Sequence, residues 1–168
     1  KRFFGHFLKG EDTGWLQSQP KVQLQIRYPG EVFVERHENE WPLARTDWTK
    51  YYIHPDTMTI STEKQVTESS AEYGGFSDGL TFLSDPLEAD LEITGPLASK
   101  LWVSSETSDA DLFLVLRAFS PDMKEVTFQG ALDPHTPLAQ GWLRCSHRKL
   151  DKDLTLPYRP YHTHDEIQ

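Results

Sequence analysis

Apolar residues near the start of the chain recur with the period of a helix. Four of them would share one face of a helix over residues 1–10, and Lys9-Gly10 is a usual helix ending. No Ser, Thr, Asp or Asn precedes the run to cap its first turn. We therefore expect residues 1–10 to be the end of a helix that continues from a preceding domain. The four apolar residues are Phe3, Phe4, Phe7 and Leu8.

After residue 10 the period changes to two, which is typical of strands. Val22, Leu24 and Ile26 alternate with polar residues before a turn at residues 28–30. Residues 112–116 are apolar at every position, which predicts a central strand covered on both faces. Further short strands are expected at residues 32–34, 48–53, 57–60, 80–83, 91–94, 101–104, 126–128 and 142–145.

Two segments carry no strand pattern. Residues 61–75 are polar and without periodicity, which predicts a long surface loop. Residues 154–166 are interrupted by Pro157 and Pro160 and are expected to be irregular. Many short strands, Pro and Gly between them, and almost no helix predict an all-β fold, a sandwich or jelly roll. We expect one such domain over residues 11–168, with some strand edges left open unless another segment pairs with them.

Composition and charge argue against some classes of binding partner. The chain has 168 residues, of which 37% are hydrophobic and 12% aromatic, enough for one hydrophobic core. A net charge of -9 without a basic stripe argues against nucleic acid and anionic membrane as partners. No apolar run has the length of a membrane span. Cys145 is the single cysteine, so no internal disulfide forms, and we expect a cytoplasmic location.

Several stretches of the chain resemble one family of hydrolases, and the similarity covers essentially the whole chain. The family is the CocE/NonD group of cocaine esterase-like serine hydrolases, whose last domain is shared with Xaa-Pro dipeptidyl-peptidases. The opening helix resembles the entry to that last domain, and the later stretches resemble its strands. The stretches are Arg2–Gly10, Glu40–Thr46, Trp48–Tyr52, Gln140–Arg148 and Pro160–Asp165.

The resemblance implies a galactose-binding-like jelly-roll β-sandwich that accompanies an α/β-hydrolase domain in the same parent protein. It also implies hydrolysis of ester or amide bonds by a Ser-Asp-His triad that lies before residue 1. This chain then contributes no catalytic, cofactor-binding or metal-binding residue, and no cofactor is expected. The family's jelly roll normally continues past Pro160–Asp165, so we expect an incomplete one here.

One motif suggests catalysis in this chain itself. Gly75-Phe76-Ser77-Asp78-Gly79 matches G-x-S-x-G, the nucleophile elbow of α/β-hydrolases. The elbow needs an apolar strand before the serine and a helix after it. Here residues 67–74 are polar and residues 80–83 have a strand pattern. We therefore predict that Ser77 is an ordinary turn residue.

Histidines and acids supply candidate metal ligands. His162, His164 and Asp165 are candidate metal ligands, since alternate residues of a strand such as 162 and 164 share a face, and His147 or His135 could complete a site. The nearby prolines favour an irregular segment and a structural role for these side chains. Four acids lack the spacing of a calcium loop and are interpreted as turn residues. These acids are Asp109, Asp111, Asp122 and Glu125.

Five tryptophans could form a platform for sugars. Trp102 and Trp142 lie in expected strands, so packing in the core or against another domain is the simpler interpretation. The others are Trp15, Trp41 and Trp48.

The leading hypothesis is a non-catalytic accessory domain that packs on a hydrolase domain and helps to form its pocket. A free-standing β-sandwich module that binds glycan or protein is the alternative, and a second copy of the chain is a further candidate partner.

Overall fold

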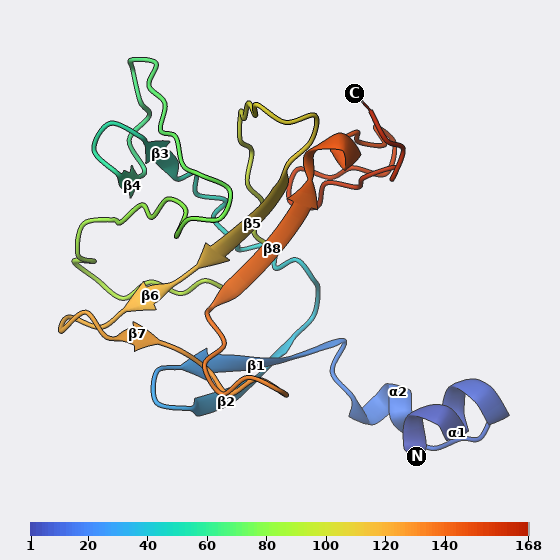
Figure 1. The fold of residues 1–168 in the computed structure, drawn as a ribbon. Helices are drawn as coiled ribbons and strands as arrows, with labels where there is room; N and C mark the ends of the chain where they lie inside the picture. The colour runs from blue at the N-terminus through green and yellow to red at the C-terminus, as the bar shows by residue number, and fades with distance from the viewer. Residues whose placement is uncertain (168) are drawn as a thin grey trace. The chain divides into compact units, whose positions relative to one another are not determined.

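The computed structural model describes residues 1–167, and its regular elements are mostly strands, with few helices (Figure 1). Its strands are β1 (Val22–Tyr28), β2 (Val32–Glu38), β3 (Tyr52–His54), β4 (Thr59–Ser61), β5 (Asp111–Leu116), β6 (Ala118–Phe119), β7 (Glu125–Val126) and β8 (Ala139–Arg144). Its helices are α1 (Arg2–Lys9), α2 (Trp15–Ser18) and the 3₁₀ turn η1 (Cys145–His147).

The chain divides into two compact units, each described here by itself. The first unit comprises Lys1–Ala44 and the residues from Thr94 onward, and the second unit comprises Arg45–Ile93. The sequence patterns indicated no such division. The expected boundary after residue 10 stays a prediction.

Helix α1 has the extent that its apolar period predicts. Gly10 ends it in the left-handed conformation at φ 67°, which a glycine adopts without steric cost. Lys1 precedes it and makes no side-chain capping bond, as expected from the missing cap residue. The Phe3 ring lies 4.8 Å from that of Phe7 and 5.4 Å from that of Trp15, between ring centroids. Trp15 belongs to α2, a short helix that the sequence analysis missed.

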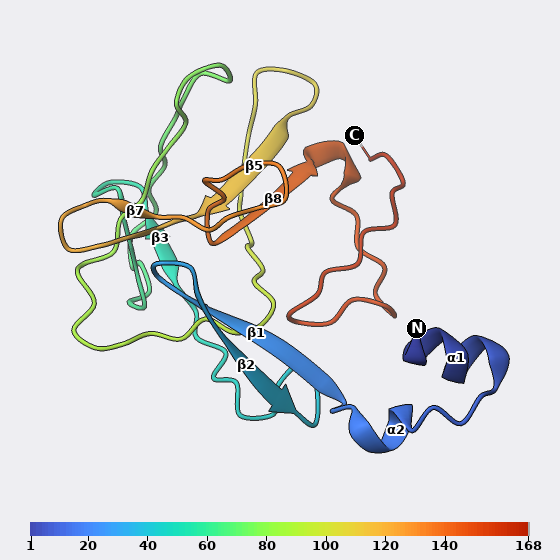
Figure 2. The same ribbon diagram turned by 90° about the horizontal axis from the view of Figure 1, so that it is seen from below.

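Strands β1 and β2 form an antiparallel hairpin and lie side by side in both views (Figures 1 and 2). Gly30 at φ 82° and Glu31 at φ 60° turn the chain between them, as the Pro-Gly signal predicts. Val22, Leu24 and Ile26 are half-buried on one face, while the residues between them are exposed. The alternation of apolar and polar residues therefore predicted this element correctly.

Strand β5 forms where residues 112–116 predict it, but the expected coverage of both faces is wrong. It pairs with β8 alone, in an antiparallel ladder that runs from Asp111↔Arg144 to Leu116↔Ala139. Leu112 and Leu116 are half-buried, whereas Phe113 is 74% exposed. Successive residues of a strand face opposite sides, and an unbroken apolar run does not show which side is packed.

Other expected strands are shorter or do not form. Strands β3 and β4 take up only parts of residues 48–53 and 57–60, and residues 80–83 contribute one bridge, between Thr59 and Leu83. Residues 91–94 and 101–104 form no strand. A short apolar run becomes a strand only where a partner offers its backbone groups, and no local pattern reports that. Residues 61–75 contain no helix or strand beyond Ser61, the last residue of β4, in agreement with the predicted loop.

The buried core is small. Among residues 1–167 the buried large apolar side chains are Leu43 and Phe128, both in the first unit. The Arg27 guanidinium lies 5.4 Å from the centre of the Phe128 ring, a cation–π distance. The strands form four two-stranded sheets, so an all-β class is supported while the jelly-roll sandwich stays a prediction.

Candidate functional site

Ser77 lies in an exposed turn of the second unit. Its hydroxyl donates to the Gly74 carbonyl at 2.7 Å, and its backbone N–H donates to the same oxygen at 2.9 Å. Gly79 donates its N–H to the Ser77 Oγ at 3.3 Å. In the described chain no strand leads directly into this turn and no helix directly follows it, so it lacks the geometry of a nucleophile elbow.

The histidines of the last segment are held by a short antiparallel contact. His162 forms a bridge with Leu150, and the Lys149 ammonium pairs with the Asp165 carboxylate at 2.8 Å. His164 has a left-handed backbone, at φ 63°. Within residues 1–167 no three His, Cys, Asp or Glu side chains gather as a metal would require. This segment is irregular apart from isolated bridges, as expected from its prolines.

Two of the four candidate acids face cations at a turn. The Asp122 carboxylate lies 2.8 Å from the Lys124 ammonium, and the Arg117 guanidinium donates to both oxygens of Glu125. The Arg117 contact lowers the pKa of Glu125. Each of these carboxylates is neutralised within its own turn, as a structural role requires.

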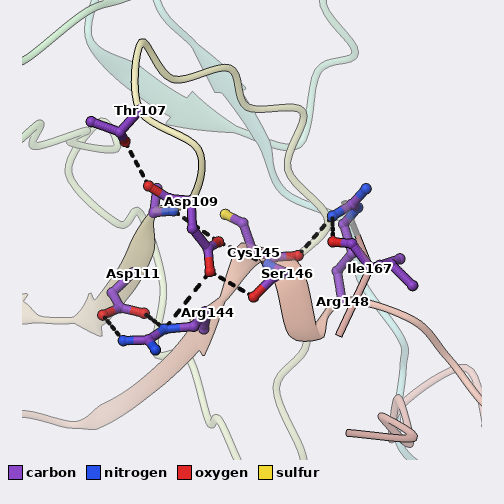
Figure 3. Close-up of polar contacts among 9 residues, drawn as sticks. Thr107, Asp109, Asp111, Arg144, Cys145, Ser146, Arg148 and Ile167 are labelled. Carbon is purple, nitrogen blue, oxygen red and sulfur yellow. Dashed lines mark hydrogen bonds and ion pairs between the residues drawn. The ribbon is translucent and has the colours of Figure 1, made fainter. Parts of the chain in front are cut away.

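The other two acids, Asp109 and Asp111, belong to a polar cluster at one end of the β5–β8 ladder (Figure 3). Asp109 lies just before β5 and accepts the Ser146 hydroxyl at 2.6 Å and the Ser146 backbone N–H at 2.9 Å. It also accepts the N–H of Ala110 at 2.9 Å. These bonds, led by that of the Ser146 hydroxyl, lower the pKa of Asp109.

Asp111 and Arg144 form the second part of the cluster. They are directly opposite each other in the ladder. The guanidinium donates from Nε at 2.8 Å and from Nη2 at 2.9 Å to the two carboxylate oxygens. This two-pronged contact lowers the pKa of Asp111 and raises that of Arg144. The pair thereby fixes the strand register and neutralises both charges.

The cluster also holds the last described residues. The Ile167 N–H donates to the Ser146 carbonyl at 2.8 Å, and Arg148 Nη1 donates to the Cys145 carbonyl at 2.9 Å (Figure 3). The Cys145 N–H donates to the carbonyl of Ala110 at 2.8 Å. These contacts connect three segments of the chain.

No sequence pattern predicts the bond between Asp109 and Ser146. The two residues are 37 positions apart, and neither belongs to a catalytic pattern. The one available signal was Ser146, which lies in the family-like stretch Gln140–Arg148. Ser146 is one of the few buried residues of the chain, which fits a structural role for its hydroxyl.

The tryptophans do not pack in a core. Trp142 is 73% exposed in β8 and Trp102 is 84% exposed in an irregular segment, so the core alternative is wrong for both. The side chain of Lys100 covers the Trp102 ring at 5.0 Å. Trp41 and Trp48 are also exposed. A sugar platform and contact with another domain both stay predictions for these exposed rings.

A shallow hollow of about 250 Å³ lies on the β5–β8 ladder. It is smaller than the usual ligand pocket of roughly 300–1,000 Å³ and contains no nucleophile with a neighbouring base. Its polar groups are the carboxylate and guanidinium of the mutually bonded Asp111–Arg144 pair. It therefore lacks the chemistry of a hydrolytic site. Its lining residues are Asp111, Leu112, Phe113, Trp142, Leu143 and Arg144.

Comparison with protein families gives one match that covers most of the chain. The model of the X-Pro dipeptidyl-peptidase C-terminal non-catalytic domain matches residues 13–162. No helix of the described residues is both long and apolar enough to cross a membrane.

Curated relatives carry esterase names. A Mycobacterium bovis protein named as a serine esterase is 27% identical over 201 residues, covering 96% of this chain and 28% of that protein. The cocaine esterase of Rhodococcus is 28% identical over 164 residues, covering 75% of this chain and 28% of the esterase. This chain thus spans under a third of the length of the curated relatives that it matches.

Solved structures with the same fold belong to a larger hydrolase. A crystal structure of a CocE/NonD family hydrolase from Staphylococcus aureus superposes with a TM-score of 0.77 at 23% identity. The match covers 98% of this chain and 30% of the hydrolase chain. A second crystal structure of that hydrolase, at a TM-score of 0.76, gives the same result.

Proposed function

This chain belongs to the family of X-Pro dipeptidyl-peptidase C-terminal non-catalytic domains, and from that premise we propose that it is the accessory domain of a CocE/NonD-type serine hydrolase. In this proposal the domain packs on an α/β-hydrolase domain of the same polypeptide and helps to form the wall of its pocket. The reaction is hydrolysis of an ester or amide bond by a Ser-Asp-His triad in the catalytic domain. The residues described here position and enclose but do not react.

The observation that carries this proposal is the exposed aromatic face of α1. Phe3, Phe4 and Phe7 lie on one helix, and all three remain exposed although Phe3 contacts both of the others. Burying each ring against a partner is worth about 1.5–3 kcal/mol. An apolar face of this kind on a short helix marks a contact surface.

An accessory role requires residues that stabilise the domain, and it requires no catalytic residues. Closing a pocket removes water and fixes the substrate, and both effects require a rigid wall rather than a reactive group. The polar cluster around Asp109 supplies rigidity by linking three segments. A jelly-roll arrangement, which the family resemblance implies, would place these segments in one scaffold.

The test uses the full-length polypeptide that carries a hydrolase domain before Lys1. Phe4→Asp combined with Phe7→Asp should loosen the attachment of the domain, because two carboxylates then enter an apolar contact. We expect a rise in KM for an activated ester or an X-Pro anilide and faster proteolysis at the domain junction. The matched control is Phe76→Asp, which places the same change on a fully exposed ring of the second unit.

Two results would contradict the proposal. One is a structure of the intact protein in which the Phe face of α1 has no neighbour within contact distance. The other is a reading frame that contains no α/β-hydrolase domain, in which case the free-standing module for glycan or protein becomes the better hypothesis.

A further inference from the structure

We propose that the outer face of the β5–β8 ladder is a second surface on which the catalytic domain packs. This face, called the aromatic face below, consists of Phe113, Val115 and Trp142. The inference rests on the proposed function, which supplies the partner. It adds a contact surface far along the sequence from α1.

The ladder separates its apolar residues by side. Phe113 is directly opposite Trp142 in the register, and the neighbouring pair Leu112↔Leu143 faces the other side. Leu112 and Leu143 are half-buried within the first unit, whereas Phe113 and Trp142 are 74% and 73% exposed. The unit therefore packs one side of its longest C-terminal ladder and leaves the aromatic side without cover.

The central positions of the aromatic face carry no charge, although the whole chain has a net charge of -9. The charged residues lie at one end of the ladder. There Arg144 donates two hydrogen bonds to Asp111 and lies 3.9 Å from the carboxylate of Asp109. The position opposite Val115 is Gln140, which is uncharged. The core of a protein–protein interface is rich in aromatic residues and poor in charged ones.

The two rings are also held in place before any partner arrives. They extend from paired strands whose register the Asp111–Arg144 contact fixes. Trp102 is even more exposed, at 84%, but it lies in an irregular segment, with Lys100 over its ring. Rigid aromatic side chains lose little entropy on binding and are favoured as interface anchors. The hollow beside the rings, about 250 Å³, has room for an apolar side chain from the partner.

The proteins that resemble this chain indicate the occupant. The chain spans 28% of the curated relatives and 30% of the solved hydrolase, so more than two thirds of those proteins lies outside the matched region. A neutral, rigid and aromatic patch fits the surface of such a large covalently attached domain. A sugar or a second copy of this chain would be a different occupant.

The experiment compares positions 142 and 102 in the full-length protein. Each is replaced separately by the photo-crosslinking residue p-benzoylphenylalanine, and crosslinked peptides are identified by mass spectrometry. We expect position 142 to crosslink to the hydrolase domain of the same polypeptide, and position 102 to give no such product. After cleavage of the linker between the domains, Trp142→Ala should weaken their association about 30-fold, while Trp102→Ala leaves it unchanged.

Each other outcome overturns the inference. Crosslinks between two polypeptides would identify a second copy as the occupant. A Trp142 that is oxidised as fast as Trp102 by hydroxyl radicals, and is protected only by added maltotriose, would identify a sugar site. If Phe4→Asp with Phe7→Asp separates the domains while position 142 stays free, the aromatic face fails and the proposed function stands. If none of these variants affects the association, both fail.

Discussion

The two compact units differ in how much of their structure their own contacts determine. The first unit contains every buried residue of the described chain, including Leu43, Phe128 and Ser146. The second unit, Arg45–Ile93, contains none, and its only ladder joins three residues of β3 to three of β4.

The difference lies in contacts between distant segments. In the first unit a six-residue ladder, an acid–arginine pair and the Asp109–Ser146 bonds connect the segment around β5 with the segment around β8. In the second unit a ladder of three residue pairs joins β3 to β4, and a single bridge joins Thr59 to Leu83. Closing a long loop costs entropy, and several contacts made together are needed to offset it.

The largest expected effect is on the free energy of unfolding, and one substitution in each unit tests it. Phe128→Ala should lower the free energy of unfolding by about 3–5 kcal/mol, because it removes a buried ring and leaves a cavity. Phe76→Ala removes a fully exposed ring of the second unit and should change it by less than about 0.5 kcal/mol. Urea denaturation followed by circular dichroism measures both. Equal effects of the two substitutions would remove the basis of the comparison.

A smaller effect is expected from the polar cluster. Ser146→Ala removes the hydroxyl that donates to Asp109 and should cost about 1 kcal/mol. Hydrogen exchange should also speed up at the Ile167 N–H, which donates to the Ser146 carbonyl. The matched control is Ser77→Ala, since the Ser77 hydroxyl contacts a carbonyl in an exposed turn. Unchanged exchange at Ile167 in the Ser146 variant would show that the cluster does not hold the last segment.

Acid should weaken the first unit through the same cluster. The Ser146 hydroxyl lowers the pKa of Asp109, and Arg144 lowers that of Asp111. Both carboxylates therefore bind protons less readily in the folded protein than in the unfolded chain. Their stabilisation is complete above the ordinary pKa of 3.8 and is lost as the pH falls through the lower folded values.

The measurement is the urea midpoint between pH 6 and pH 2.5. Asp111→Asn should reduce the slope of the midpoint at the acid end, and added salt should reduce it further because these groups are exposed to solvent. A midpoint that rises as the pH falls would contradict the assigned direction.

The smallest expected effect is on the reactivity of Ser77, in the second unit. Ser77 has no base to take its proton, since its hydroxyl donates to the carbonyl of Gly74. Incubation with a fluorophosphonate probe and an activated ester should give only background signal, identical in Ser77→Ala. Stoichiometric labelling that disappears in the variant would make this turn an active site and would overturn the accessory role.

Local patterns predicted those elements that neighbouring residues alone can determine. Helix α1 follows from the spacing of its apolar residues and from Gly10, and the β1–β2 hairpin follows from alternation and from Pro29-Gly30. Strand β5 follows from its apolar run. The family was also evident in the sequence, because its motifs are runs of adjacent residues such as Gln140–Arg148.

Tertiary structure alone decided which segments pair and which faces remain open. Residues 91–94 and 101–104 have strand patterns but form no strand. Asp109 and Ser146 lie in no pattern that predicts a contact, yet two hydrogen bonds join them. The apolar run of β5 likewise did not show that Phe113 would be exposed. The physical reason is that pairing depends on backbone partners brought from far along the chain, and the residues of one segment carry no record of them.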